Sequence, residues 1–365
     1  MDLVTTIINF ILNGVGQVFF MGSPLVGVIF LLAIGVNSWK AAVFGLIGSI
    51  AGGLVGFALG IPTNTVVFGI YGFNSVLTAI ALGDTFLEKG KAAYALAVVG
   101  ALFTGFTTAT MIWVTGRFGL PVETSAFVMT TWIFLFASYK LAGIKLATGG
   151  SPPKQRSTLV TDTSKENSLK LHEFSFSGLV RLVFTGIGQV FFQESWKSGL
   201  LIFIGLTIAS VSLTPFAFGV QYPIFFGGVV VFIASLVGTL TAIVLKADRT
   251  SVLMGLYGFN AVLTSLAVMG VFLGFFLPIQ GFPGSPINFV VMIFAVILSS
   301  IVTAFMGSIT GRWNLPTLTG PFVLTSWFVE LAAHVFPNIS GYSAAFIGPW
   351  IPVILHHTTL LLALL

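Results

Sequence analysis

This chain has long stretches without aspartate, glutamate, lysine or arginine, and among them are residues 3–39, 41–83, 92–116, 198–245 and 250–311. A helix needs about 20 apolar residues to cross the ~30 Å hydrocarbon core of a bilayer, and every stretch is longer than that. Charged residues make up 7% of the chain, whereas a soluble domain carries about 25%. So few charges cannot cover a soluble surface, and we therefore expect a membrane protein.

Proline and glycine clusters divide these stretches at residues 61–64, 214–215 and 281–286. Several stretches therefore hold two crossings, and the chain is predicted to form roughly ten to twelve transmembrane or partly spanning helices. The short, glycine-rich runs at 68–77 and 254–263 are candidates for the partly spanning segments.

Three motifs occur twice in the chain, in the same order. Gln-Val-Phe-Phe, Tyr-Gly-Phe-Asn, and Leu-Pro followed by Thr are the shared letters, and the motifs lie at Gly14–Phe20 and Gly186–Phe192, at Phe68–Leu77 and Met254–Leu263, and at Thr115–Thr124 and Thr310–Thr319. The chain is therefore two copies of one design.

In the first motif an amide is followed three residues later by an aromatic ring: Gln17 with Phe20, and Gln189 with Phe192. A continuous helix would place the amide and the ring on one face. We therefore expect each pair to share one helix face.

In the second motif each ring precedes an aliphatic side chain by four residues, Phe73 before Leu77 and Phe259 before Leu263. The two side chains then stack on one helix face, and the usual meaning of such spacing is a packed core. An asparagine follows each ring, however, and a buried amide needs hydrogen-bond partners that plain packing does not provide.

In the third motif Thr124 and Thr319 open an apolar run, where a hydroxyl can face inward. We expect Arg117 and Arg312 at headgroups or helix ends rather than in a pore. Glu123 is expected to be a helix-start carboxylate rather than a charge at a pore mouth.

A stripe of small residues recurs at every fourth position, at Gly48, Gly52, Gly56 and Gly60. It leaves one helix face without side chains, so another backbone can approach closely. Helix packing is the favoured interpretation, and a pore wall is the alternative.

The expected organisation has four parts. Residues 1–144 form the first half, 145–175 a flexible polar linker, 176–342 the second half, and 343–365 an extra C-terminal apolar helix without a counterpart in the first half. The linker has more basic than acidic residues, which concerns membrane topology and not binding of nucleic acid.

Several kinds of site are disfavoured. The chain has no cysteine, which excludes disulfides and thiolate metal sites. None of its four histidines is duplicated between the halves, and no nucleophile, base or metal set is doubled or clustered. We therefore expect no cofactor and no enzymatic activity. The acidic start Met1-Asp2, with no small-residue cleavage site up to Phe20, argues against a signal peptide.

Together the three doubled motifs resemble the urea transporter family, in its bacterial members, over about residues 5–140 and 176–340. The resemblance implies an all-α membrane protein whose two homologous halves form an inverted repeat around a central pore, and a homotrimer in which each protomer conducts. It places pore amides at Gln17 and Gln189, a slot of rings and aliphatic side chains at Phe20, Phe73, Leu77, Phe192, Phe259 and Leu263, and central hydroxyls at Thr124 and Thr319.

The first half departs from the family pattern at two positions. Ala126 stands where the second half has Pro321, and Glu123 stands where it has Leu318. Both departures flank Thr124, so they bear on how that hydroxyl is placed.

The chemistry of these residues suits urea, which is flat and neutral and loses hydrogen bonds to water on entering a narrow path. Glutamine carbonyls and threonine hydroxyls can accept bonds from its N–H groups, and an uncharged lining avoids binding it too tightly. Stacked phenylalanines leave a slot for a planar amide, and neutral residues cannot offset the desolvation of an ion.

A passive urea channel in the inner (plasma) membrane is therefore the favoured function, with urea and the lipid bilayer as partners. The alternative is an ion-coupled secondary transporter of another small neutral amide-like solute, because inverted repeats serve both mechanisms. No ion-coupling carboxylate is evident in either repeat. The basic linker argues for a cytoplasmic position, whereas the resemblance implies that the linker lies outside the cytoplasm, which we favour.

Overall fold

A computed structural model describes residues 2–141, 143–147, 175–217, 226–271 and 286–335. Most of the predicted linker and the predicted extra helix at 343–365 lie outside these described residues. The described residues form helices, apart from connecting turns and one isolated bridge between Leu87 and Leu146.

The first half contains α1 (Leu3–Gly16), η1 (Gln17–Phe19), α2 (Pro24–Asn37), α3 (Trp39–Ala58), α4 (Thr63–Val67), α5 (Gly72–Ile80), the π-helical turn η2 (Ala81–Thr85), α6 (Lys91–Gly116) and α7 (Ser125–Ser138). The second half contains α9 (Phe176–Gly188), η5 (Gln189–Phe191), α10 (Trp196–Ala217), α11 (Phe226–Val244), α12 (Arg249–Leu253), α13 (Leu256–Val271), α14 (Pro286–Thr310), η6 (Gly311–Trp313) and α15 (Gly320–Val335). The doubled motifs therefore lie at equivalent elements of the two halves.

Several helices begin at a polar residue whose side chain accepts a hydrogen bond from a backbone N–H of the first turn. Such caps satisfy N–H groups that the helix itself leaves unpaired. The capping side chains, each with the residue whose N–H it accepts and the donor–acceptor distance, are Asp2 with Thr5 (2.8 Å), Ser38 with Ala41 (3.2 Å), Ser175 with Gly178 (3.2 Å) and Asp248 with Ser251 (2.8 Å).

Within the described residues, five helical segments are long and apolar enough to span a bilayer: Trp39–Ala58, Thr63–Thr85, Lys91–Gly116, Gly227–Val244 and Phe289–Trp313. Two further pairs pass the same test together but bend sharply at a short break, α1 with α2 by 70° and α9 with α10 by 78°. If each bent pair is one span, the number rises to seven. The prediction of an all-α, multi-pass membrane protein is confirmed.

These bends correct the expectation that Gln17 and Phe20 share one face of a continuous helix. The helix α1 ends before them, η1 follows, and Phe20 adopts a left-handed backbone conformation with φ 61°. Phe192 does the same with φ 62°. The Met21 N–H donates to the Gly16 carbonyl at 3.1 Å and closes this turn. The first motif therefore marks a helix end, where a change of chain direction aims the amide and the ring independently.

The glycine stripe on α3 is a packing surface, as predicted. A Cβ atom on Gly48 would meet the backbone of Ser75, and one on Gly52 would meet the carbonyl of Tyr71. The missing side chains therefore let α3 and α5 approach closely. Gly60 is the exception, because it lies beyond the end of α3 with φ +73°.

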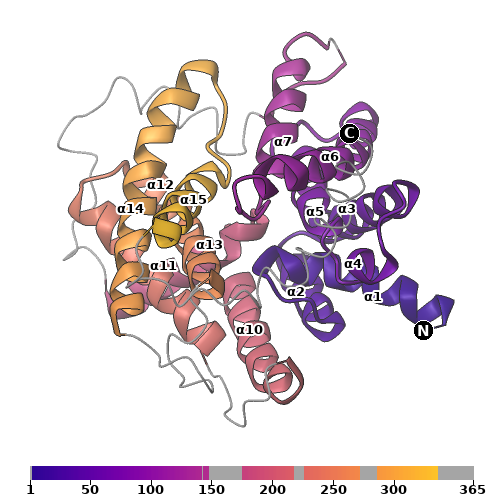
Figure 1. The fold of residues 1–365 in the computed structure, drawn as a ribbon. Helices are drawn as coiled ribbons and strands as arrows, with labels where there is room; N and C mark the ends of the chain where they lie inside the picture. Colours follow the sequence, from indigo (N-terminus) through magenta and orange to yellow (C-terminus); the bar gives the residue numbers. More distant parts are fainter. Residues whose placement is uncertain (1, 142, 148–174, 218–225, 272–285, 336–365) are drawn as a thin grey trace.

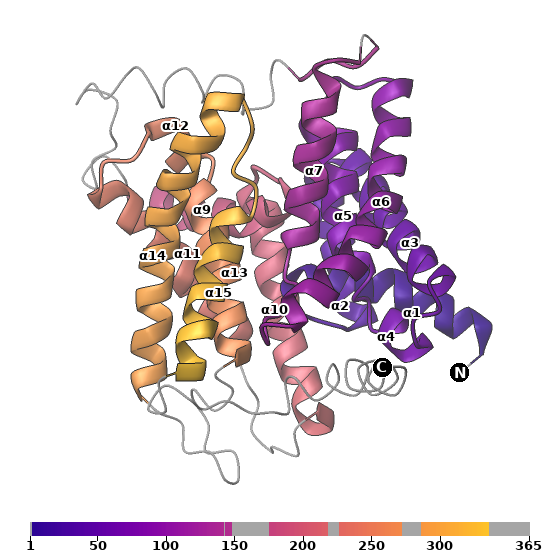
Figure 2. The same ribbon diagram turned by 45° about the horizontal axis from the view of Figure 1, so that its top comes forward.

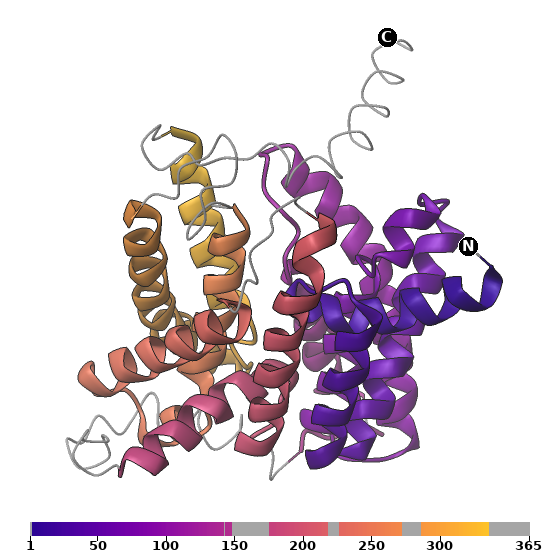
Figure 3. The same ribbon diagram turned by 90° about the horizontal axis from the view of Figure 1, so that it is seen from below.

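The two halves lie side by side, with α2 of the first half against α10 of the second (Figures 1 and 2). Figure 3 shows the same two-lobed arrangement from below. A main hydrophobic core contains buried residues of both halves, including Phe19, Phe30, Phe191 and Phe322. The interface between the halves is therefore part of the protein's core.

Reciprocal contacts relate the halves to each other. Trp132 on α7 donates its indole N–H to the Pro316 carbonyl (2.8 Å), and the equivalent Trp327 on α15 donates to the Pro121 carbonyl (3.0 Å). When a residue of one copy contacts a second residue in the other copy, and the two equivalent residues make the same contact in the opposite direction, a two-fold axis relates the copies. Equivalent residues that touch each other then lie on the axis, and Phe19 with Phe191 is such a pair, with ring centroids 5.5 Å apart.

Candidate pore-lining site

Thr124 and Thr319 form a second pair of equivalent residues on the axis. Their hydroxyl oxygens are 2.6 Å apart and hydrogen-bonded, and each residue is 2% exposed. Each threonine is the first residue before a helix, α7 or α15, at the inner end of a Leu-Pro loop. The two predicted central hydroxyls are therefore brought together from positions 195 residues apart.

A buried asparagine holds each threonine loop. The side chain of Asn74 donates to the Glu123 carbonyl (3.0 Å) and accepts from the Phe127 N–H (3.1 Å). Asn260 repeats this with the Leu318 carbonyl (3.5 Å) and the Phe322 N–H (3.2 Å). These are the partners that a buried amide needs, and they fix the loop on both sides of each threonine.

The loops also need an unusual backbone conformation just before each threonine. Glu123 has φ 45° and Leu318 has φ 52°, in the left-handed region that costs non-glycine residues energy. Because the asparagine bonds span this position, they offset the strain. The two loops match, so Ala126 in place of the proline leaves the Thr124 backbone in the same arrangement. A residue in the first turn of a helix needs no intrahelical N–H bond, which makes proline optional there.

Phenylalanines flank the threonine pair in another reciprocal arrangement. Phe20 packs edge-on against Phe322 with ring centroids 6.3 Å apart, and Phe192 packs edge-on against Phe127 at 6.0 Å. The ring of Phe86 also lies 5.6 Å from that of Phe192. In each half, the phenylalanine of the first motif, Phe20 or Phe192, thus contacts a ring of the other half, in the edge-to-face geometry that aromatic quadrupoles favour.

The remaining slot residues are buried in the main core. Phe73 and Leu77 lie on α5, and Phe259 and Leu263 lie at the equivalent positions of α13. All four belong to the hydrophobic cluster against which Phe20 and Phe192 pack. All six predicted slot residues therefore belong to, or pack against, one hydrophobic core that contains residues of both halves.

A cavity of about 100 Å³ opens beside the second-half residues. Its lining includes Gln189, Phe192 and Phe259, residues 315–318 before Thr319, and Thr85 and Phe86 from the first half. Mostly apolar walls with a few polar groups are typical of small-molecule sites. Three of the ten predicted site residues thus line one cavity.

The two glutamine amides differ in their partners. Gln17 donates its side-chain N–H to the Phe68 carbonyl at 3.0 Å. Gln189 is 7% exposed, and its side-chain carbonyl oxygen has no hydrogen-bond partner among the described residues. A buried, unpaired acceptor that faces a cavity is ready for a donor from a solute.

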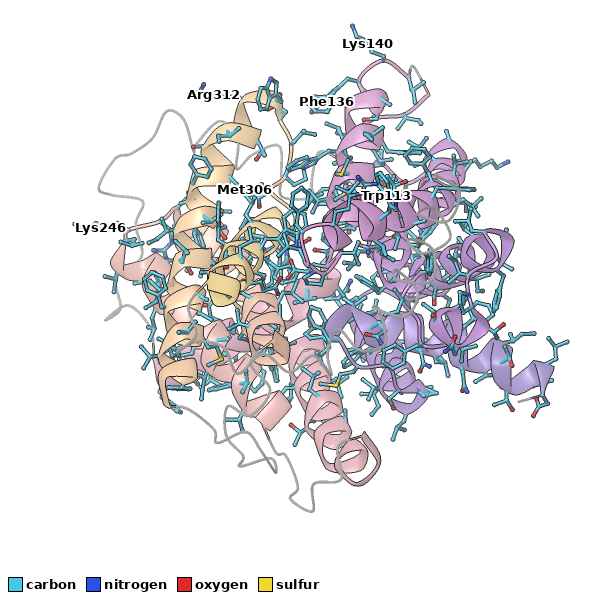
Figure 4. All side chains as sticks on the ribbon, viewed as in Figure 1. Trp113, Phe136, Lys140, Lys246, Met306 and Arg312 are labelled. Atoms are coloured by element: carbon cyan, nitrogen blue, oxygen red, sulfur yellow. The ribbon has the colours of Figure 1, made fainter. Side chains whose placement is uncertain are left out.

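Several positive side chains of the described residues lie away from this site. Lys140, Lys246 and Arg312 lie at the periphery of the molecule (Figure 4). Arg117 ends α6, and its guanidinium stacks on Trp113, 3.8 Å from the ring centroid. The expectation that Arg117 and Arg312 lie at helix ends is confirmed.

Glu123 is not the helix-start carboxylate that the sequence favoured. It is 2% exposed, both of its carboxyl oxygens lack a hydrogen-bond partner among the described residues, and it interacts electrostatically with Glu330 of α15, also 2% exposed. The reason is the turn before α7, which directs residue 123 toward α15 instead of toward the helix end.

Sequence reasoning missed Glu330, Phe127, Phe322 and the two tryptophans. Trp132 and Trp327, and Phe127 and Phe322, recur at the same spacing as the threonines, so extending the third motif would have found them. Glu330 has Leu135 as its counterpart and gave no such signal.

The comparisons with known proteins agree with these motifs. A family model described as "Urea transporter" matches residues 2–139, 141–225 and 220–346. Urea transporter 1 of Ovis aries is 24% identical over 340 residues, which are 91% of this chain and 78% of that protein. Urea transporter 1 of Mus musculus is 36% identical over 127 residues, 35% of this chain and 33% of that protein.

Proposed function

The chain belongs to the urea transporter family, and on that premise we propose that it conducts urea passively, down its gradient, through a narrow uncharged pore between its two halves. Members of the family are membrane transporters and not enzymes, so urea is the transported substrate. The proposal adds the mechanism and the residues that perform it.

One observation carries the proposal: the unpaired carbonyl oxygen of Gln189 beside a cavity of about 100 Å³ that Phe192 and Phe259 also line. Urea is a donor of N–H bonds, and an acceptor without a partner in a protected cavity compensates for the water that urea loses. The rings provide flat apolar walls for the faces of a planar amide. The cavity thus offers what urea needs and offers little to a hydrated ion.

In this mechanism urea enters beside Gln189 and passes along the slot formed by Phe192, Phe259 and Leu263. At the centre the hydroxyls of Thr124 and Thr319 exchange their mutual bond for bonds to urea, so that no buried hydroxyl is left unpaired. The solute then leaves past the equivalent side chains Phe20, Phe73, Leu77 and Gln17. Binding stays weak at each step because every contact is neutral, which permits rapid exit.

The assembly and location belong to the same proposal. We expect the protein to lie in the inner (plasma) membrane as a homotrimer, with the axis between its halves in the membrane plane, so that the halves have opposite orientations. The reciprocal contacts of Trp132 and Trp327 support the two-fold relation. Exposed apolar side chains on α6, including Val99, Phe103 and Phe106, suit a surface that meets lipid or another protomer.

Flux measurements on purified protein in liposomes test the proposal. Urea should cross down its gradient with no ATP, proton gradient or sodium gradient, and Gln189→Leu should reduce the flux by roughly 2- to 10-fold, as expected for a hydrogen bond of about 0.5–1.5 kcal/mol. Gln17→Leu is the matched variant: it removes the equivalent acceptor, and with it the side-chain N–H that donates to the Phe68 carbonyl. Flux that disappears when ion gradients are collapsed would favour the ion-coupled alternative, and unchanged flux in Gln189→Leu would remove this residue from the path.

A further inference from the structure

The mechanism above leaves two buried carboxyl groups unused. Glu123 comes from the first half and Glu330 from the second, and each is 2% exposed. None of the four carboxyl oxygens has a hydrogen-bond partner among the described residues. Ionisable side chains are costly inside a membrane protein and usually mark function.

The geometry of α15 places the two carboxyls together. Trp327 is bonded to the Pro121 carbonyl, which fixes α15 against the loop that contains Glu123. Glu330 follows Trp327 by almost one helical turn, and Ser326 precedes Glu330 by four residues on the same face. The Ser326 hydroxyl lies beside the Glu123 carboxyl but donates its bond to the Phe322 carbonyl (2.9 Å), so it leaves that carboxyl unpaired.

The other copy of the repeat shows that the fold does not require these acids. The residue equivalent to Glu123 is Leu318, and the residue equivalent to Glu330 is Leu135. Both leucines are buried in the main core, 3% and 1% exposed. The first-half loop and α15 therefore bring together two acids at positions that are both leucine in the other copy.

Among the described residues, neither carboxyl forms an ion pair with a cation. Helices α5, α7 and α14 contain no aspartate, glutamate, lysine, arginine or histidine, and α13 adds only the phenol of Tyr257. On α15 itself His334 follows Glu330 by four residues in the sequence. Arg117 is exposed and stacked on Trp113. Two buried carboxylates that interact with each other are destabilised when both are charged, which favours the binding of a proton by the pair.

We propose that Glu123 and Glu330 form a proton-binding site beside the central threonines, and that loss of its proton slows urea conduction. This inference rests on the proposed passive function. Glu123 is the residue next to Thr124, and its carbonyl holds the Asn74 bond that positions the loop. When both carboxyls are charged, they repel each other and separate α15 from the loop. The two threonine hydroxyls then lose their common position, and the path loses its central acceptor. Urea flux should therefore fall as pH rises.

The test compares urea flux in liposomes that have the same pH on both sides, from about pH 5 to about pH 9, a range that covers ordinary and strongly shifted carboxyl groups. Wild-type flux should fall several-fold across this range. The double variant Glu123→Leu/Glu330→Leu copies the residues of the other half, so it should fold, conduct urea and show no pH dependence. Glu123→Gln/Glu330→Gln tests the same point with polar side chains of similar shape, and His334→Gln should keep the wild-type profile.

An infrared spectrum gives a readout that does not depend on flux. The carbonyl band of a buried protonated carboxyl should be present in the wild type at neutral pH and absent from both double variants. A wild-type pH profile retained in the double variants, or lost in His334→Gln, would overturn the proton site. Urea flux that is present in the wild type but independent of pH would also overturn the site while leaving the proposed function intact, and absence of urea flux at every pH would contradict the proposed function itself.

Discussion

Equivalent residues that have the same type in the two halves do not always have the same partners. Gln17 and Gln189 occupy corresponding helix ends, yet the first is bonded to the Phe68 carbonyl and the second keeps an unpaired oxygen beside a cavity. The threonines differ from the glutamines because they bond to each other. Residue type thus sets what a side chain can donate or accept, and its neighbours decide what is left for a solute.

The threonine pair yields a prediction of non-additivity. Thr319→Val keeps the β-branched shape but removes one acceptor and leaves the Thr124 hydroxyl without its partner. Flux should fall roughly 5- to 150-fold, for a cost of about 1–3 kcal/mol. Adding Thr124→Val should cost much less than the sum of the single changes, because the hydroxyls act as a unit.

Thr110→Val is the control for this series. Thr110 is exposed on α6, and its hydroxyl bonds to the Phe106 carbonyl of its own helix. Its flux should match the wild type in the same stopped-flow liposome assay. Additive effects of the two central changes would contradict the idea of a coupled pair.

At the scale of elements, short buried helices position the loops that carry the site. The nine-residue helix α5 packs on the glycine face of α3 and presents Asn74 to the loop before α7. In the second half α13 presents Asn260 to the loop before α15. The threonine hydroxyls therefore owe their positions to amides on other helices.

The two asparagines should differ in their contribution to stability. Asn74 holds its loop with bonds of 3.0 and 3.1 Å, whereas the bonds of Asn260 are 3.5 and 3.2 Å. Asn74→Ala should lower the free energy of unfolding by about 1–3 kcal/mol and Asn260→Ala by less, because longer hydrogen bonds are weaker.

Thermal unfolding of the two variants in detergent measures this difference. Ser308→Ala is the control. Ser308 is exposed, and its hydroxyl donates to the Phe305 carbonyl of its own helix, so this change removes a hydrogen bond without touching either loop. A larger loss in Asn260→Ala than in Asn74→Ala would contradict the ranking.

At the scale of the whole molecule, the halves contact each other through a two-fold relation that no segment contains by itself. The contacts Phe19–Phe191, Thr124–Thr319 and the two tryptophan bonds all join residues from different halves. An axis in the membrane plane would place the start and the end of each half on opposite sides of the bilayer, which makes the side of the linker a test of the arrangement.

The linker should face away from the cytoplasm. The chain has no cysteine, so Ser164→Cys would be its only thiol. An impermeant thiol reagent added to intact cells should label this variant. Labelling that appears only after lysis would place the linker in the cytoplasm, as the positive charges alone would suggest.

The sequence by itself determined that the chain lies in a lipid bilayer, that it is all-helical and that it contains two copies of one design. Long uncharged stretches and repeated motifs are properties of the chain alone. It also predicted ten side chains of the candidate site, and it indicated the surface of α3 that packs on α5. Hydrogen-bonding capacity follows from residue type, so Asn74 and Asn260 could be recognised as groups in need of partners before those partners were known.

The tertiary structure alone decided the directions and the pairings. The turn at Phe20 separates an amide from a ring that a continuous helix would have aligned, and it depends on a bond between the Met21 N–H and the Gly16 carbonyl. The repeats do not predict the interaction between Glu123 and Glu330, because the two acids occupy non-equivalent positions. Contacts between residues far apart in the chain depend on how two halves pack in space, and spacing along one copy carries no information about that packing.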